Sequence, residues 1–146
     1  MAENKNSIYR KDYQQPNYWA ENISLGFLIE ADYTRVKSNT RYKKNKLSNE
    51  NSLVLHGVDL ELNKIAINGL DLSDAEYQID GEILTIKKAP DKFELLIENK
   101  IYPAKNTALE GLYQSGNFFL TQCEAEGFRK ITYFQDRPDV MASYDV

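Results

Sequence analysis

Histidine and cysteine limit the chemistry that this chain can perform by itself. His56 is the only histidine and Cys123 the only cysteine among 146 residues. Imidazole is the commonest ligand and general base of hydrolytic sites, so a zinc site built from two histidines cannot form within the chain. His56 and Cys123 could form a reactive thiolate pair if the fold brought them together. A structural histidine at a strand end and a packed cysteine are the favoured interpretation.

Carboxylates crowd the last third of the chain, where a pair could perform acid–base chemistry of the kind that glycosidases use. The alternative is that they are simply solvated, since the chain has 22 acidic residues. Glu124 stands out because Thr121 to Phe128 mixes polar and small residues where a strand should end. Such a turn can hold a carboxylate against a ligand. The other members of this group are Glu110, Glu126, Asp136 and Asp139.

A basic segment provides a second candidate binding surface. Six basic side chains lie between Arg35 and Lys46, close in sequence to Tyr33 and Tyr42. Basic residues interleaved with aromatic ones can follow a single-stranded nucleic acid and stack on its bases. The alternative is a solvated edge strand protected by lysines, and the acidic net charge of the chain favours it.

Aromatic side chains near the N-terminus provide a third candidate. Trp19 could stack on sugar rings together with three tyrosines, as aromatic platforms on β-sandwiches do. Large amphipathic rings more often pin a terminal segment to a core, and we favour that role here. The tyrosines are Tyr9, Tyr13 and Tyr18.

The composition indicates one folded domain without a general affinity for polyanions. Charged residues make up 27% of the chain and apolar residues 42%, as in ordinary globular domains. Eighteen basic and 22 acidic side chains give a net charge of −4, which offers no global attraction to nucleic acid or anionic lipid. The chain has no apolar run of the length of a signal or a membrane span, and no disulfide can form. A cytoplasmic location is the expectation.

The hydrophobic pattern that must position these candidates is that of β-strands. Apolar residues alternate with mainly polar ones from Ile23 to Tyr33, the period of a half-buried strand. The basic segment Arg35 to Lys46 could pair back on this strand. No window of ten or more residues has a helical period, although Phe128, Ile131 and Phe134 could line one short turn. Further strands are expected at 53–56, 60–67, 77–79, 82–86 and 92–100.

Two dipeptides predict tight hairpins between these strands. Asn68-Gly69 follows one apolar run, and Asp80-Gly81 joins two others. Both dipeptides favour the positive φ angles that type I′ turns require. Several short strands at this spacing predict an all-β fold, an antiparallel sandwich or barrel with little helix.

The sequence resembles the zinc aminopeptidase N metallopeptidases over nearly its whole length. The strongest similarity lies in Asn106 to Gly116, which reads NTALEGLYQSG, in Thr121 to Thr132, TQCEAEGFRKIT, and in Gln135 to Val140, QDRPDV. The opening Tyr9-Arg10 with Asp12-Tyr13 and the block Leu53 to Leu60 are also similar. The resemblance implies a saddle-shaped N-terminal β-domain over residues 1–146. We expect this domain to be truncated at its C-terminal end, with the catalytic zinc domain absent from this chain.

The same resemblance assigns roles to two residues of the turn. It places Glu124 where the family's N-terminal domain caps the active site and binds the α-ammonium of the substrate, and Gln122 beside the first side chain. It also implies a cis peptide between Glu124 and Ala125. The expected partners are a peptide with a free N-terminus and the catalytic domain of the parent chain, not nucleic acid or membrane. Zinc is expected in the full-length parent but not in this fragment, which is expected to be inactive alone.

A second function stays open at this point. The chain could be a stand-alone β-sandwich module that binds peptides or sugars through Trp19 and the tyrosines. A nucleic-acid binder that uses the segment Arg35 to Lys46 is a further alternative, and its affinity would fall steeply with salt.

Overall fold

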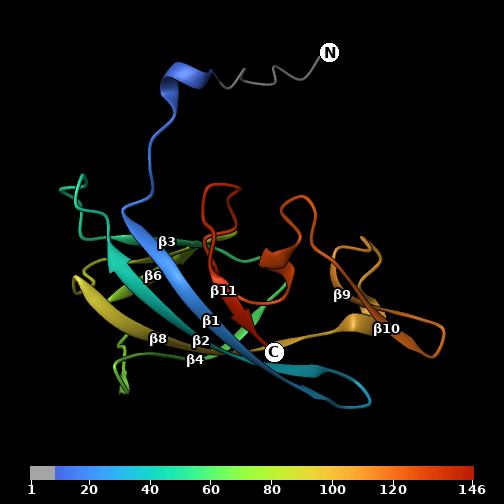
Figure 1. Ribbon diagram of the computed structural model, residues 1–146. Helices are drawn as coiled ribbons and strands as arrows, with labels where there is room; N and C mark the ends of the chain where they lie inside the picture. The colour runs from blue at the N-terminus through green and yellow to red at the C-terminus, as the bar shows by residue number, and fades with distance from the viewer. Residues whose placement is uncertain (1–8) are drawn as a thin grey trace.

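The computed structural model describes residues 9–146, and nearly all of their regular structure is β-strand (Figure 1). Within this part of the chain, eleven strands form three sheets, of six, three and two strands. The helical segments of these residues are three single turns of 3-10 helix: η1 (Arg10–Asp12), η2 (Pro103–Lys105) and η3 (Phe128–Lys130). Within residues 9–146, no helix has the length and apolar character needed to span a membrane. The predicted all-β fold with little helix is confirmed.

The six-stranded sheet is built around two long strands, β1 (Tyr18–Ile29) and β2 (Thr34–Lys44). Its order is β11-β1-β2-β8-β4-β5, and all neighbours are antiparallel except β1 and β11. β1 begins before the predicted start at Ile23 and ends before Tyr33, which lies after the turn. The other strands of this sheet are β4 (Glu61–Ile67), β5 (Leu70–Asp71), β8 (Lys92–Ile101) and β11 (Ser143–Asp145).

β2 lies in the middle of this sheet, so the predicted edge strand is wrong. The predicted pairing with the preceding strand is confirmed, and the other side of β2 pairs with β8. Alternate side chains of β2 from Thr34 to Tyr42 are buried, while the basic side chains between them are exposed. The lysines therefore occupy the solvated face of a central strand, a pattern that an antiparallel sheet with one wet face allows.

The core lies between this sheet and the three-stranded sheet, which has the order β3-β7-β6. These strands, β3 (Leu53–His56), β7 (Ile83–Ile86) and β6 (Tyr77–Asp80), lie on one side of the large sheet in Figure 1. Leu53, Leu55 and Leu84 are fully buried in one cluster with side chains of β1, β2 and β8. The strands predicted in these regions are therefore confirmed, and their inner faces form the sandwich core.

The two predicted hairpin turns have different outcomes. Asn68 and Gly69 both have positive φ, 50° and 81°, as a type I′ turn requires. In the other hairpin Asp80 still pairs with Ile83, so the two loop residues are Gly81 and Glu82, and only Gly81 has positive φ. Glycine at the first loop position is the pattern of a type II′ turn. The prediction of type I′ at Asp80-Gly81 was wrong because the strand register extends the pairing through Asp80.

The last third of the chain leaves the large sheet and returns to it. β9 (Gly111–Ser115) and β10 (Phe118–Gln122) form a separate hairpin at one end of the molecule (Figure 1). η3 follows, and Phe134 then forms an isolated bridge with His56 at the end of β3. The segment ends in β11, which pairs in parallel with β1. The predicted short turn around Phe128 and Ile131 is confirmed as η3.

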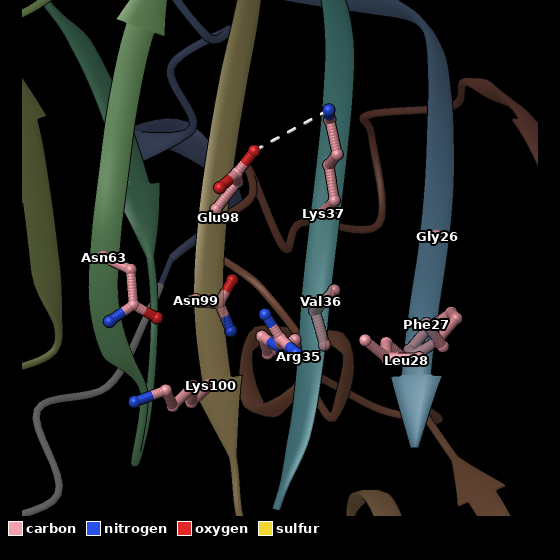
Figure 2. Close-up of a pocket in the computed structure, with 10 residues that line it drawn as sticks. All are labelled: Gly26, Phe27, Leu28, Arg35, Val36, Lys37, Asn63, Glu98, Asn99 and Lys100. Carbon is pink, nitrogen blue, oxygen red and sulfur yellow. Dashed lines mark ion pairs between the residues drawn. The ribbon is translucent and has the colours of Figure 1, made fainter. Parts of the chain in front are cut away.

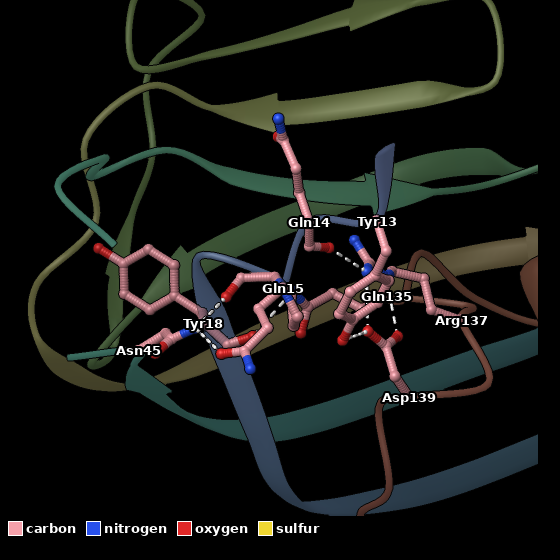
Figure 3. Close-up of polar contacts among 9 residues, drawn as sticks. Tyr13, Gln14, Gln15, Tyr18, Asn45, Gln135, Arg137 and Asp139 are labelled. Atoms are coloured by element: carbon pink, nitrogen blue, oxygen red, sulfur yellow. Dashed lines mark hydrogen bonds and ion pairs between the residues drawn. The ribbon is translucent and has the colours of Figure 1, made fainter. Parts of the chain in front are cut away.

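Polar contacts fasten the N-terminal segment to residues 128–145, which we call the returning segment (Figure 3). The Tyr13 hydroxyl donates to Asp139 Oδ2 at 2.8 Å, and Arg137 Nη2 donates to the carbonyl oxygen of Gln14 at 2.7 Å. Gln135 Nε2 donates to the carbonyl oxygen of Tyr18 at 3.0 Å in a buried environment. The contacts tie residues 13–18 to residues 135–139, which lie more than a hundred positions later in the chain.

Candidate functional site

The predicted site residues lie on a closed turn between β10 and η3. Gln122 ends β10, and its Nε2 donates to the carbonyl oxygen of Glu124 at 3.0 Å. The carbonyl oxygen of Cys123 accepts a hydrogen bond from the amide of Gly127 at 2.9 Å. The Glu124-Ala125 peptide is cis, as the resemblance implied, and Glu126 has a φ of 67°. The structure thus brings Gln122 and Glu124 together.

The carboxylate of Glu124 is free to meet an external cation. Glu124 is exposed, and it makes no ion pair or side-chain hydrogen bond with residues 9–146. Three other carboxylates of the last third are engaged by arginines: Glu126 and Asp136 with Arg129 at 3.4 and 3.0 Å, and Asp139 with Arg137 at 2.8 Å. Those three therefore support the fold, whereas Glu124 has no such role.

Close backbone packing fixes the turn against the start of β9. Gly127 is buried, and a Cβ atom there would lie 2.6 Å from the carbonyl oxygen of Gln122 and 3.0 Å from Cys123 Cα. Its φ of −87° is open to any residue, so the requirement for glycine is steric. Gly111 faces it, and a Cβ atom there would lie 3.1 Å from the carbonyl oxygen of Gly127. Sequence reasoning missed both glycines, since a single glycine in a turn rarely signals close contact.

Arg129 holds the residues that follow the turn. Its backbone amide and its Nε both donate to Asp136 Oδ2, at 3.1 and 3.0 Å, and its Nη2 donates to the carbonyl oxygen of Asp136 at 3.0 Å. The carbonyl oxygen of Arg129 accepts a hydrogen bond from the amide of Val58 at 2.9 Å. The turn is therefore anchored on both sides, by β10 before it and by this arginine after it. Sequence reasoning placed Asp136 among candidate acids and missed its partner.

Residues 8–146 match the peptidase M1 N-terminal domain. This chain belongs to the peptidase M1 family. It is 48% identical over 140 residues to aminopeptidase N of Haemophilus influenzae and 43% identical over 144 residues to that of Escherichia coli. These alignments cover 93% and 99% of this chain but only 16% of each relative. The M1 N-terminal domain described here therefore spans about a sixth of the length of those curated relatives.

Solved structures share the fold. Legionella pneumophila aminopeptidase A, solved in complex with aspartic acid, matches with a TM-score of 0.84 and 29% identity, over 92% of this chain and 16% of that one. The M1 zinc metallopeptidase of Deinococcus radiodurans matches with a TM-score of 0.70 at 12% identity, over 89% of this chain and 32% of that one. The second likeness concerns the fold alone.

His56 and Cys123 do not form a catalytic pair in this M1 N-terminal domain. Within residues 9–146 no hydrogen bond joins them, and the backbone of His56 bridges Phe134 with N···O distances of 2.8 and 3.1 Å. Burial raises the pKa of the Cys123 thiol, and the charge of Asp136 raises it further. A nucleophilic cysteine needs a lowered pKa. This geometry supports a structural role for both His56 and Cys123.

The aromatic residues near the N-terminus do not form a common platform. Tyr18 is fully buried, and its hydroxyl donates to the carbonyl oxygen of Ala89 at 2.8 Å. Trp19 follows it in β1 and is only half-buried, since successive strand residues point to opposite faces. Tyr13 is engaged with Asp139. The pinning role is confirmed for Tyr18, whereas Tyr13 is 55% exposed and is held through its hydroxyl, and Tyr9 is 57% exposed. The four residues therefore share no common surface for a sugar.

Four of the five basic residues of β2 lie beside a glutamate, and the fifth, Lys44, donates to Asn51. Arg35 pairs with Glu30 at 3.2 Å and Lys37 with Glu98 at 3.7 Å. Figure 2 shows Arg35 and Lys37 beside a pocket of about 550 Å³ on the large sheet, which none of residues 121–128 lines. Tyr42 is buried in the core, so it cannot stack on a base. This arrangement gives no support to nucleic-acid binding.

The residues of this domain do not fit a catalytic zinc site. No group of three or more histidine, cysteine, aspartate or glutamate side chains gathers in a metal-binding arrangement within residues 9–146. The one histidine lies in a strand bridge, and burial together with the nearby positive charge of Arg129 lowers its pKa.

Replacing Gly127 by alanine tests the packing that fixes the turn. The new Cβ would overlap the carbonyl oxygen of Gln122, so we expect the free energy of unfolding to fall by about 1–3 kcal/mol. Gly26→Ala is the matched control, because a Cβ there meets only the carbonyl oxygen of Lys37, at 4.0 Å. Urea unfolding of both variants measures the difference. Equal unfolding midpoints for the two variants would refute this packing.

The lowered pKa of His56 predicts a pH dependence of stability. The folded chain resists protonation of this imidazole, so the unfolded chain binds more protons once the pH falls below the ordinary value of 6.5. We expect stability to fall as the pH drops from 7 to 5.5, and to fall less in His56→Gln. Urea midpoints at the two pH values provide the comparison. A pH dependence unchanged by the substitution would assign the effect to other groups.

Proposed function

We propose that this M1 N-terminal domain is part of a zinc-dependent aminopeptidase that removes N-terminal residues from peptides. In this proposal the domain caps the active site, Glu124 binds the α-ammonium of the substrate, and Gln122 lies beside the first side chain. The observation that carries the proposal is an exposed, unpaired Glu124 carboxylate on a turn that is anchored on both sides. The similarity to aminopeptidase N of two bacteria supports the reaction class.

The chemistry of the turn suits the recognition of an amine. A carboxylate that meets an ammonium directly gains a charge-assisted hydrogen bond, and the gain grows when the contact is sheltered from water. An internal peptide bond carries no such charge, so the contact would restrict hydrolysis to the free end of the peptide. Gln122 is uncharged, and its Nε2 already donates to the backbone carbonyl oxygen of Glu124, so we expect this side chain to tolerate many first residues.

The zinc is proposed to be bound by another part of the full-length polypeptide, where it would polarise the scissile carbonyl and activate water. The contribution proposed for the described residues is the capture of the substrate amine and its orientation. A loosely held carboxylate would perform this poorly, because orientation requires fixed geometry. The Gly127 contact and the Arg129–Asp136 contacts would supply that rigidity.

Glu124→Gln in the full-length protein tests this role. The substitution keeps the size of the side chain and removes its charge, so we expect kcat/KM for an alanyl chromogenic amide to fall about 10- to 150-fold, the value of a charged hydrogen bond of about 1.5–3 kcal/mol. Glu126→Gln is the matched control. It removes the same charge two residues away, from a side chain that faces Arg129, and we expect a change of less than about threefold.

Chelation distinguishes the remaining outcomes of this experiment. Activity that is lost on chelation and restored by zinc supports the zinc aminopeptidase. Equal losses in Glu124→Gln and Glu126→Gln would indicate a general effect of negative charge, and would reject direct binding of the ammonium by Glu124. A folded, zinc-supplied full-length protein without activity would reject the proposed reaction.

A further inference from the structure

The outer face of the large sheet carries a pocket where β1, β2, β8 and β4 run side by side (Figure 2). Its volume is about 550 Å³, which suits a small ligand, and we call it the outer pocket. Two rows of directly opposite residues cross it, one of Gly26, Lys37 and Glu98 and one of Leu28, Arg35 and Lys100. Gly26 leaves the space open, since a Cβ atom there would meet only the carbonyl oxygen of Lys37, at 4.0 Å.

Two positive charges face each other in the second row. Arg35 of β2 lies directly opposite Lys100 of β8, and like charges in such positions destabilise a sheet. Arg35 Nη2 donates to Glu30 at 3.2 Å, and Lys100 Nζ donates to Glu61 at 3.1 Å. Neither glutamate lines the pocket. The row itself therefore contains no carboxylate that could separate the two cations.

Both cations keep donors for a ligand. The bonds to Glu30 and Glu61 are the only side-chain hydrogen bonds that Arg35 and Lys100 make within residues 9–146. A guanidinium has five N–H groups and an ammonium three, so most of these donors are unused. The side chains of Arg35 and Lys100 are 54% and 30% exposed. A ligand can therefore reach them without breaking the existing ion pairs.

The surroundings of Arg35 define the chemistry of the ligand. Leu28 lies directly opposite Arg35 on the side away from Lys100 and is 52% exposed, so an anion held by Arg35 has an apolar neighbour. Arg35, Lys37 and Lys100 each have a carboxylate partner already, which leaves little surplus positive charge. A single carboxylate matches the planar fork of the guanidinium. A phosphate dianion would bring more negative charge than these paired cations can offset.

We propose that the outer pocket binds a small carboxylate with an apolar tail. The carboxylate lies between Arg35 and Lys100, and the tail covers Leu28 and the open space at Gly26. Such a ligand relieves the repulsion between the two cations and buries an exposed leucine. None of residues 121–128 lines this pocket, so the site is separate from the proposed amine site and does not depend on it.

Saturation-transfer NMR titrations of the full-length protein test this site. The probes are hydrocinnamate and its primary amide, and we expect the acid to bind at least about tenfold more tightly, the value of a charged hydrogen bond. Arg35→Gln is expected to weaken hydrocinnamate by a similar factor. Arg41→Gln is the matched control, because Arg41 is an exposed arginine of the same strand that also faces a glutamate and does not line the pocket. We expect it to change the affinity by less than about twofold.

A second variant fills the pocket and leaves every charge in place. Gly26→Leu is expected to abolish binding of hydrocinnamate without lowering the urea midpoint of the protein, because its side chain enters open space. Binding that survives in both Gly26→Leu and Arg35→Gln would place the probe at another site, the catalytic site included, and would overturn the inference.

The choice of probe decides the chemical class of the ligand. Equal binding of hydrocinnamate and its amide overturns the carboxylate, and tighter binding of inorganic phosphate than of hydrocinnamate overturns the apolar tail. The N-acetylated dipeptide of alanine and phenylalanine presents the same phenyl group beside a peptide C-terminus. Tighter binding of this dipeptide than of hydrocinnamate supports the site with a peptide C-terminus as its ligand, and the reverse order supports it with a free acid.

Discussion

Burial of the inner face of the six-stranded sheet against the three-stranded sheet is the interaction on which the rest of the structure depends. That face is not wholly apolar, because Ser38 and Asn99 are buried in it. Ser38 shares a hydrogen bond with Thr132 at 3.0 Å, and Asn99 Nδ2 donates to the carbonyl oxygen of Ile131 at 3.0 Å. Buried polar groups need partners, so these contacts hold the returning segment on the sheet. The position of the Glu124 turn follows, since Arg129 and Asp136 join the turn to that segment.

Charge is distributed so that the carboxylates beside the Glu124 turn are paired internally while that of Glu124 is not. The basic residues on the outer face of the large sheet have acidic neighbours, and two arginines engage the carboxylates around the returning segment. The Arg137 hydrogen bonds hold the pKa of Asp139 below its usual range, as expected of a structural carboxylate. Glu124 lies outside these pairs. A ligand with a positive charge would therefore find it without first displacing an internal cation.

Much of this arrangement could be predicted from the sequence, because alternation of apolar residues is a local signal. The strands at 53–56 and 92–100 and the Asn68-Gly69 turn follow from it directly. The central position of β2 could not be predicted, since the order of strands depends on pairing between distant segments. The same pattern of exposed lysines suits an edge strand and the wet face of a central one.

The candidate site, too, could be predicted only in part from the sequence. Glu124 and Gln122 could be singled out through the composition of their turn and the family resemblance, and the structure brings them together. The contacts that fix them could not be foreseen. The packing of Gly127 against Gln122 and the Arg129–Asp136 hydrogen bonds require knowledge of which backbones approach each other. No pattern in a single sequence predicts either contact.

The most direct test of the central claim compares two inhibitors that differ only in the α-amino group. Their inhibition constants are measured on the full-length enzyme and on its Glu124→Gln variant. The ammonium contact predicts that removing the amino group weakens binding to the native enzyme by about 10- to 150-fold, and by less than about threefold in the variant. An equal loss in both enzymes would show that the amine is recognised elsewhere, and would contradict the role proposed for Glu124.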